Sequence, residues 1–188
     1  MARLGPRIAE IQINAFKAVF GEKLFSTLYT VAKDVKLQLT FNPDNVSKYR
    51  LVGYENRLLN KEDFENDTKD AGELGAGHTV TVCYELVLTD TAKTADGEWM
   101  TLAVRHKKPT ETMSNLNEYE LDKSIYTDTP SDDFKFIGAV IETTMLLRES
   151  KYIGSVTFED VQKTLNELTL TNSPDRYEFR ELINKLTD

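Results

Sequence analysis

Apolar and polar residues alternate in the first well-defined stretch of the chain, residues 34–41. The odd positions hold the apolar side chains, Val35, Leu37, Leu39 and Phe41, and the even positions after Asp34 hold Lys36, Gln38 and Thr40. A period of two is typical of a strand with one buried face, so these residues predict a strand whose odd side chains lie in the core. An Asn-Pro turn over residues 42–45 ends this strand, and residues 49–54 predict a second one.

Residues 78–88 carry the longest alternating run and predict the longest strand, with Val82 on its apolar face. The dipeptide Asp96-Gly97 follows, and this pair is typical of the tight turn of a β-hairpin. Residues 98–106 then return as a further strand, and residues 117–125 predict a weaker one. The pattern therefore indicates a run of antiparallel strands in the first two thirds of the chain.

Apolar residues at intervals of three and four predict helices at both ends of the chain. Residues 6–20 and 22–29 form two such segments, and three more follow residue 129, with Ser131 and Thr157 as N-caps and Pro174 in a first turn. Strands followed by helices indicate an α+β fold. We expect an antiparallel β-sandwich-like sheet with an N-terminal helix and a helical C-terminal lobe. The expected divisions are a helical lead-in over residues 1–30, a sheet domain over residues 31–128 and the lobe over residues 129–188.

The composition narrows the class of partner. The chain has 188 residues, a formal net charge of -8 and a pI of about 4.9. This balance disfavours nucleic acid and anionic membranes, which require a basic surface. No apolar run is long enough to span a bilayer, and residues 1–16 lack the apolar core of a signal peptide. Cys83 is the one cysteine, so no internal disulfide is predicted, and its place in an alternating run predicts a buried side chain.

The most acidic segment, residues 61–77, is a candidate calcium site. Its carboxylates are Asp63, Glu65, Asp67, Asp70 and Glu73. The spacing differs from that of an EF-hand, because Thr68 stands where that loop needs glycine and Leu74 stands at its twelfth position. A solvated loop with turn glycines is the alternative interpretation. A calcium-stabilised binding domain is therefore the second hypothesis for function, and no cofactor is predicted.

Two histidines, His78 and His106, are the candidates for acid–base chemistry. They lie in separate predicted strands, and the sequence has neither a nucleophile elbow nor the spacing of a zinc motif. We expect no enzymatic activity, and a hydrolase built on either histidine ranks behind the binding hypotheses.

Four segments together resemble a known family. Residues 30–43, 49–59, 70–86 and 145–150 are similar to the C-terminal domain, of unknown function, of bacterial von Willebrand factor A domain proteins of the YfbK type. In that family the region follows an A domain with an Asp-x-Ser-x-Ser metal motif, which this sequence lacks. The resemblance therefore does not imply metal-dependent adhesion here. An excised piece of such a protein and a stand-alone relative both fit the sequence.

The resemblance implies an accessory or interaction module in the bacterial cell envelope, either periplasmic or associated with the outer membrane. Such a module would support an A domain in cis or bind a protein partner. The alternation adds an expectation about stability. Leu37→Asp or Val82→Asp should unfold the sheet because each would bury a charge. Lys107, assigned to a polar loop, should tolerate replacement by alanine.

Overall fold

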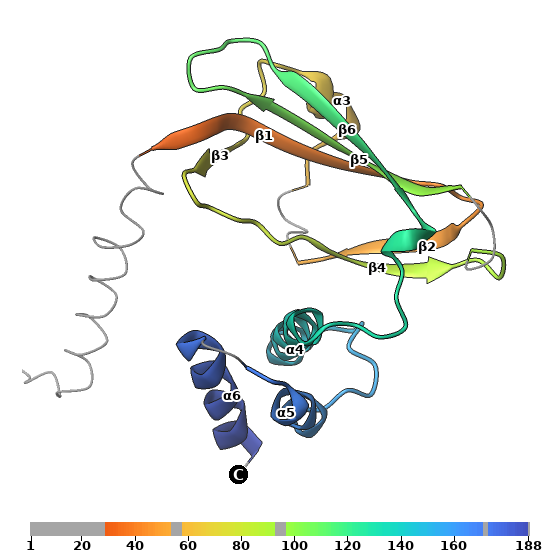
Figure 1. The fold of residues 1–188 in the computed structure, drawn as a ribbon, viewed down its shortest axis with the longest axis vertical. Coiled ribbons are helices and arrows are strands. Elements are labelled where there is room, and N and C mark those ends of the chain that lie inside the picture. Colours follow the sequence, from red (N-terminus) through yellow and green to blue (C-terminus); the bar gives the residue numbers. More distant parts are fainter. Residues whose placement is uncertain (1–28, 54–57, 93–96, 171–172, 188) are drawn as a thin grey trace, which may run out of the picture. The chain divides into compact units, whose positions relative to one another are not determined.

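The computed structural model describes residues 29–53, 58–92, 97–170 and 173–187. The chain divides into two units, Met1–Ile125 and Tyr126–Asp188. The strands belong to the first unit, and the three longest described helices belong to the second (Figure 1). This arrangement confirms the α+β class. The helices predicted over residues 6–20 and 22–29 lie outside the described residues, apart from Tyr29, and the three predicted divisions of the chain stay predictions.

The larger sheet has four antiparallel strands. They are β1 (Thr30–Phe41), β3 (Gly72–Gly75), β5 (Glu98–Lys107) and β6 (Asn115–Asp122), in the spatial order β3-β1-β5-β6. The alternating residues 34–41 lie in β1, as predicted. The short strand β3 comes from the glycine-rich stretch that the sequence assigned to a loop.

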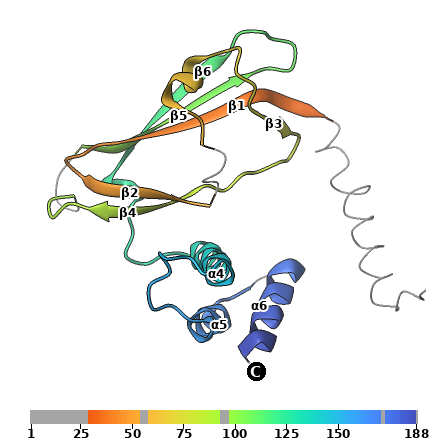
Figure 2. The same cartoon turned by 180° about the vertical axis from the view of Figure 1, so that it is seen from behind.

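The smaller sheet has two strands, β2 (Val46–Val52) and β4 (Cys83–Leu88), which lie on one side of the larger sheet in both views (Figures 1 and 2). The hairpin predicted at Asp96-Gly97 is wrong, because β4 pairs with β2 whereas β5 pairs with β1 and β6. The chain therefore changes sheet between residues 88 and 98. The Phe41 ring joins the two sheets, with its centroid 4.4 Å from that of Tyr49 and 5.5 Å from that of Tyr84.

The predicted strand over residues 78–88 is shorter in the structure, where β4 begins at Cys83. Its pairing with β2 ends at the pair of Cys83 with Val52. The sandwich-like packing that the alternation predicted is not confirmed.

A β-bulge at Asp34 sets the orientation of the second half of β1. Lys33 pairs with Lys107 and Lys36 pairs with Arg105, so β1 has one more residue than β5 in this interval. Asp34 takes φ of 51°, a left-handed conformation that Asp tolerates better than most residues.

The burial of β1 differs from the prediction made from its alternation. Lys36 is only 2% exposed, whereas Leu37, assigned to the core, is 50% exposed. Val82 is 38% exposed, so it is not a core residue either. At Lys36, therefore, β1 is covered on the side that the sequence assigned to solvent, whereas Thr40 on the same side is exposed.

The second unit contains α4 (Asp132–Leu147), α5 (Phe158–Glu167) and α6 (Pro174–Thr187). The predicted caps are confirmed: Ser131 Oγ accepts a hydrogen bond from the Phe134 amide, and Thr157 forms a capping box with Asp160. The buried core consists of Ala139, Val161, Leu165, Leu168, Leu170 and Ile183. None of the helices in the described ranges is both long and apolar enough to cross a membrane.

Candidate functional site

An open groove of about 720 Å³ runs beside the second half of β1. Every residue from Val35 to Phe41 lines it, and Tyr49, Tyr84, Val80 and Val82 contribute further walls. Consecutive residues of a strand point to opposite faces of the sheet. A cavity lined by seven consecutive residues must therefore follow the edge of the strand rather than one of its faces.

This edge of β1 carries main-chain groups that pair with no strand in the described part of the chain. The strand β3 pairs with β1 only between Thr30 and Val35, and no described strand continues that pairing. The Asn42 amide donates to the Trp99 carbonyl at 2.9 Å, on the β5 side. Because antiparallel strands alternate the direction of their hydrogen-bonding groups, the even residues of this half of β1 point toward β5. The amides and carbonyls of Leu37, Leu39 and Phe41 then point into the groove.

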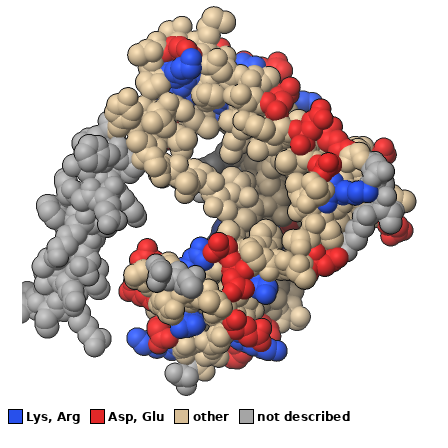
Figure 3. Space-filling view, in the orientation of Figure 1, with Lys and Arg blue, Asp and Glu red and all other residues tan. Residues whose placement is uncertain are grey.

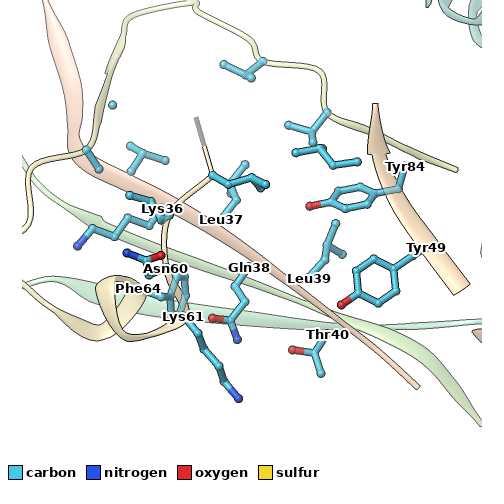
Figure 4. A pocket seen from close by; sticks show the side chains of 18 of the residues that line it. Lys36, Leu37, Gln38, Leu39, Thr40, Tyr49, Asn60, Lys61, Phe64 and Tyr84 are labelled. Atoms are coloured by element: carbon cyan, nitrogen blue, oxygen red, sulfur yellow. The ribbon is translucent and has the colours of Figure 1, made fainter. Parts of the chain in front are cut away.

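The two sides of the groove differ in character. Leu37 and Leu39 lie on the side of Tyr84, whereas Gln38 and Thr40 lie on the opposite side, together with Lys61 (Figure 4). Two of the large apolar side chains that line the groove are exposed, Leu37 to 50% and Val80 to 53%, and exposed apolar side chains gathered in one groove are typical of a binding surface. Burial raises the pKa of the Tyr84 phenol above its ordinary value, which is consistent with an apolar wall.

Lysines supply all the charge among the 19 described residues that line the groove, namely Lys36 and Lys61. The whole chain has 31 Asp and Glu residues and 23 Lys and Arg residues. On the face shown in Figure 3, charges of both signs are interspersed, and the part formed by the sheets also presents a broad uncharged area. The groove is therefore apolar with a positive margin in an otherwise acidic protein.

A short helix, α3 (Lys61–Glu65), forms the polar wall of the groove. The Lys36 ammonium group fixes it by donating to the carbonyls of Asp63 at 3.0 Å and Asn66 at 2.5 Å. These carbonyls lie at the C-terminal end of α3, where a helix leaves carbonyls without internal partners. Phe64, 8% exposed, packs beneath Arg105, whose guanidinium lies 5.8 Å from the ring centroid. Lys36 thus has a structural role that its position in the alternation concealed.

A second buried lysine, Lys107, fixes the segment after α3. Its ammonium group donates to Asp34 Oδ2 at 2.6 Å and to the Asp67 carbonyl at 2.7 Å, and Lys107 is 8% exposed. Ser114 donates to the Asp67 carboxylate through both its hydroxyl and its amide. Hydrogen bonds from Lys107 and Ser114 lower the pKa values of Asp34 and Asp67, respectively. The placement of Lys107 in an exposed polar loop was therefore wrong.

The candidate calcium ligands are dispersed along this wall. Asp67 is bonded to Ser114, Asp63 lies 3.8 Å from the Lys69 ammonium group, and Glu73 accepts a hydrogen bond from Thr30. Glu65 and Asp70 are exposed. Across the described ranges, no three His, Cys, Asp or Glu side chains come together as a metal site. The structure thus gives the calcium hypothesis no support, and it stays an untested alternative.

The other candidate side chains lie away from one another. His78 is exposed after β3, and His106 is half-buried in β5 opposite Asn115. Neither imidazole forms an ion pair or hydrogen bond with any residue in the described part of the chain. Cys83 is half-buried in β4, and burial raises the pKa of its thiol, which disfavours the reactive thiolate.

The groove itself could not be located from the sequence, because its walls come from β1, β2, α3 and the segment before β4. The sequence carried one partial signal, because the alternating apolar residues Val35, Leu37, Leu39 and Phe41 all line the groove in the structure. The fold and the groove together define a small α+β domain in which no described strand pairs with the second half of β1 on its groove side.

Comparison with known proteins assigns this domain to a family. Residues 26–188 match the family model described as "Uncharacterized protein YfbK, C-terminal". The chain is 35% identical to the protein YfbK of Escherichia coli (strain K12), with 80% of this chain and 29% of the relative covered. The chain therefore belongs to the YfbK C-terminal family, as its motifs indicated, and it spans less than a third of that relative. The search of solved structures found no match.

Proposed function

We propose that this domain is a non-enzymatic interaction module that binds a polypeptide segment in the groove along β1. The observation that carries the proposal is the coincidence of exposed apolar side chains with main-chain groups that no described strand pairs with, along the same edge. Monomeric proteins rarely leave either feature open, because both favour association with another chain. Non-catalytic binding accounts for the site without a nucleophile or base.

The proposed setting of this module rests on the resemblance of the chain to proteins of the YfbK type. We propose that it serves a von Willebrand factor A-type protein of the bacterial cell envelope, where the bound segment belongs to the A domain or to a protein partner. Fractionation of cells that produce the native protein tests the location. Recovery with periplasmic or outer-membrane proteins is expected, and recovery with cytosolic enzymes would contradict this part of the proposal.

Selection from a phage-displayed library of random dodecapeptides tests the binding function directly. Peptides selected on the whole chain are synthesised, and their affinities are measured by fluorescence anisotropy. Leu37→Asp should weaken binding at least about tenfold, because it places a charge in the apolar wall. Leu116→Asp is the matched control, since Leu116 on β6 is 46% exposed and Leu37 is 50% exposed.

Three results bear on the proposal. Loss of affinity in Leu37→Asp with unchanged affinity in Leu116→Asp supports the groove as the binding site. Equal losses in both variants would place binding elsewhere. Failure of the library to yield any binder would remove the polypeptide-binding function.

A further inference from the structure

We infer that the segment bound in the groove is an extended strand of a partner protein, which adds to the larger sheet beside β1 and carries a carboxylate that pairs with Lys61. The inference rests on the proposed polypeptide-binding function and specifies its mode and the chemistry of the partner.

The first ground for this mode is a strand position beside β1 that no described strand occupies. The strand β3 fills the outer edge of β1 up to the pairing of Val35 with Gly72, and Ala71 and Gly72 line the groove at that end. The groove continues the line of β3 along residues 36–41. Six residues in extended conformation span about 20 Å, which is the usual length of a strand. A segment in this position would pair with the outward main-chain groups of Leu37, Leu39 and Phe41.

The two sides of the groove define the side chains of the segment. A strand presents alternate side chains to opposite sides, so one set would meet Leu37 and Leu39, which are apolar. The other set would lie on the side of Gln38, Thr40 and Lys61 (Figure 4). The matching ligand is therefore a segment with apolar residues at alternate positions and polar residues between them.

Charge complementarity indicates that the bound segment carries a carboxylate. Among the described residues that line the groove, both charged ones are lysines, in a chain with a net charge of -8. Lys36 already donates to two carbonyls of the α3 segment. Lys61 is exposed at the start of α3, and its side chain has no hydrogen-bond or ion-pair partner among the described residues. An acidic residue on the polar side of the bound strand would supply that partner.

The test uses the whole chain and a capped hexapeptide, Thr-Val-Glu-Val-Thr-Val, followed by NMR. At saturation, hydrogen exchange of the Leu37, Leu39 and Phe41 amides should slow at least about tenfold, because each amide gains a strand partner. The amides of Gln38 and Thr40, which already point to β5, should change little. Two N-methylated analogues, one methylated at the three valines and one at the other three residues, provide a second readout. Only one analogue should lose affinity, since alternate amides of an added strand point away from β1.

A charge exchange tests the role of Lys61. The peptide with Lys in place of Glu should bind the native chain several-fold more weakly, and Lys61→Glu should reverse this preference, because the charges would again be opposite. Lys108→Glu is the control, since Lys108 is exposed and does not line the groove. An unchanged preference in Lys61→Glu would overturn the assignment of the carboxylate.

The remaining outcomes separate this inference from the proposed function. Binding without protection of the three amides, or equal effects of the two methylated analogues, would overturn strand addition while leaving polypeptide binding intact. If library peptides bound only when Leu37 was present and the hexapeptide did not bind, strand addition would likewise be overturned while polypeptide binding remained. Amides protected before any peptide is added would show another occupant. Protection that depends on protein concentration would identify a second copy, and protection independent of concentration would identify another segment of this chain; either result would overturn the partner assignment.

Discussion

Replacement of Lys107 by methionine tests whether the buried polar contacts hold the wall of the groove. Lys107→Met keeps most of the side-chain volume but removes the ammonium group that bonds Asp34 Oδ2 and the Asp67 carbonyl. The Asp34 carboxylate would remain with a hydrogen bond from the Ala71 amide at 3.2 Å. It would lie largely desolvated, since its side chain is 19% exposed.

The expected cost follows from this partial burial. Hydrogen bonds to charged groups contribute about 1.5–3 kcal/mol each, and removal of one partner of a fully buried ion pair costs about 3–5 kcal/mol. Because the Lys107 side chain is 10% exposed and that of Asp34 is 19% exposed, water compensates part of the loss. We therefore expect the free energy of unfolding of the sheet unit to fall by about 2–4 kcal/mol.

Tryptophan fluorescence during urea denaturation measures this quantity in the right part of the molecule. Trp99 is the one tryptophan of the chain, and it is 2% exposed in β5. Lys108→Met is the matched control, because the Lys108 side chain is 64% exposed and pairs with Glu111 three residues away. The control should lie within about 0.5 kcal/mol of the native chain. If Lys107→Met unfolded at the same urea concentration as Lys108→Met, the reasoning from burial would be refuted.

The pH dependence supplies an independent check on the same contact. Lys107 lowers the pKa of Asp34 below its ordinary value of 3.8, chiefly through the hydrogen bond. A carboxylate with a lowered pKa contributes stability that is present above its unfolded pKa and lost as the pH falls through the folded pKa. The difference between the native chain and Lys107→Met should therefore be complete at neutral pH and shrink below the ordinary value. A difference that stayed constant into acid would mean that Asp34 is not the relevant partner.

Three further predictions concern individual side chains. Leu37→Asp should lower the free energy of unfolding of the sheet unit by less than about 1 kcal/mol, because Leu37 is half exposed. Urea denaturation followed by tryptophan fluorescence measures this change. Loss of the folded state would show that Leu37 is a core residue after all. Burial raises the pKa of Glu142 above its ordinary value. The ionised carboxylate therefore destabilises the folded unit at pH values above the folded-state pKa, and this destabilisation is absent at pH values below the unfolded-state pKa. Glu142→Gln should therefore slow hydrogen exchange at Leu165 at neutral pH but not in acid, and the reverse order would contradict the sign. Thr157→Ala removes a capping box and should destabilise α5 by about 1 kcal/mol in the same exchange experiment; no change would mean that the cap is dispensable.

The sequence predicted those features that depend on neighbours in the chain. Ser131 and Thr157 mark helix starts because a short oxygen-bearing side chain reaches the free amides of the first turn. The alternation at residues 35–41 specifies an extended segment for the same reason, since a period of two matches only a pleated strand. The family was also recognisable from the sequence, because its motifs are continuous segments. From these local patterns the α+β class followed.

Tertiary contacts decided which side of each strand is buried and which strands pair. Alternation assigns two faces to β1 but does not say what covers each of them. Here α3 covers the polar face, where Lys36 finds carbonyl partners, and the apolar face at Leu37 stays open. The hairpin signal at Asp96-Gly97 failed in the same way, because β5 pairs with β1 and β6 and β4 pairs with β2. The groove depends on segments separated by up to 49 positions, from Val35 to Tyr84, so only the folded chain could bring its walls together.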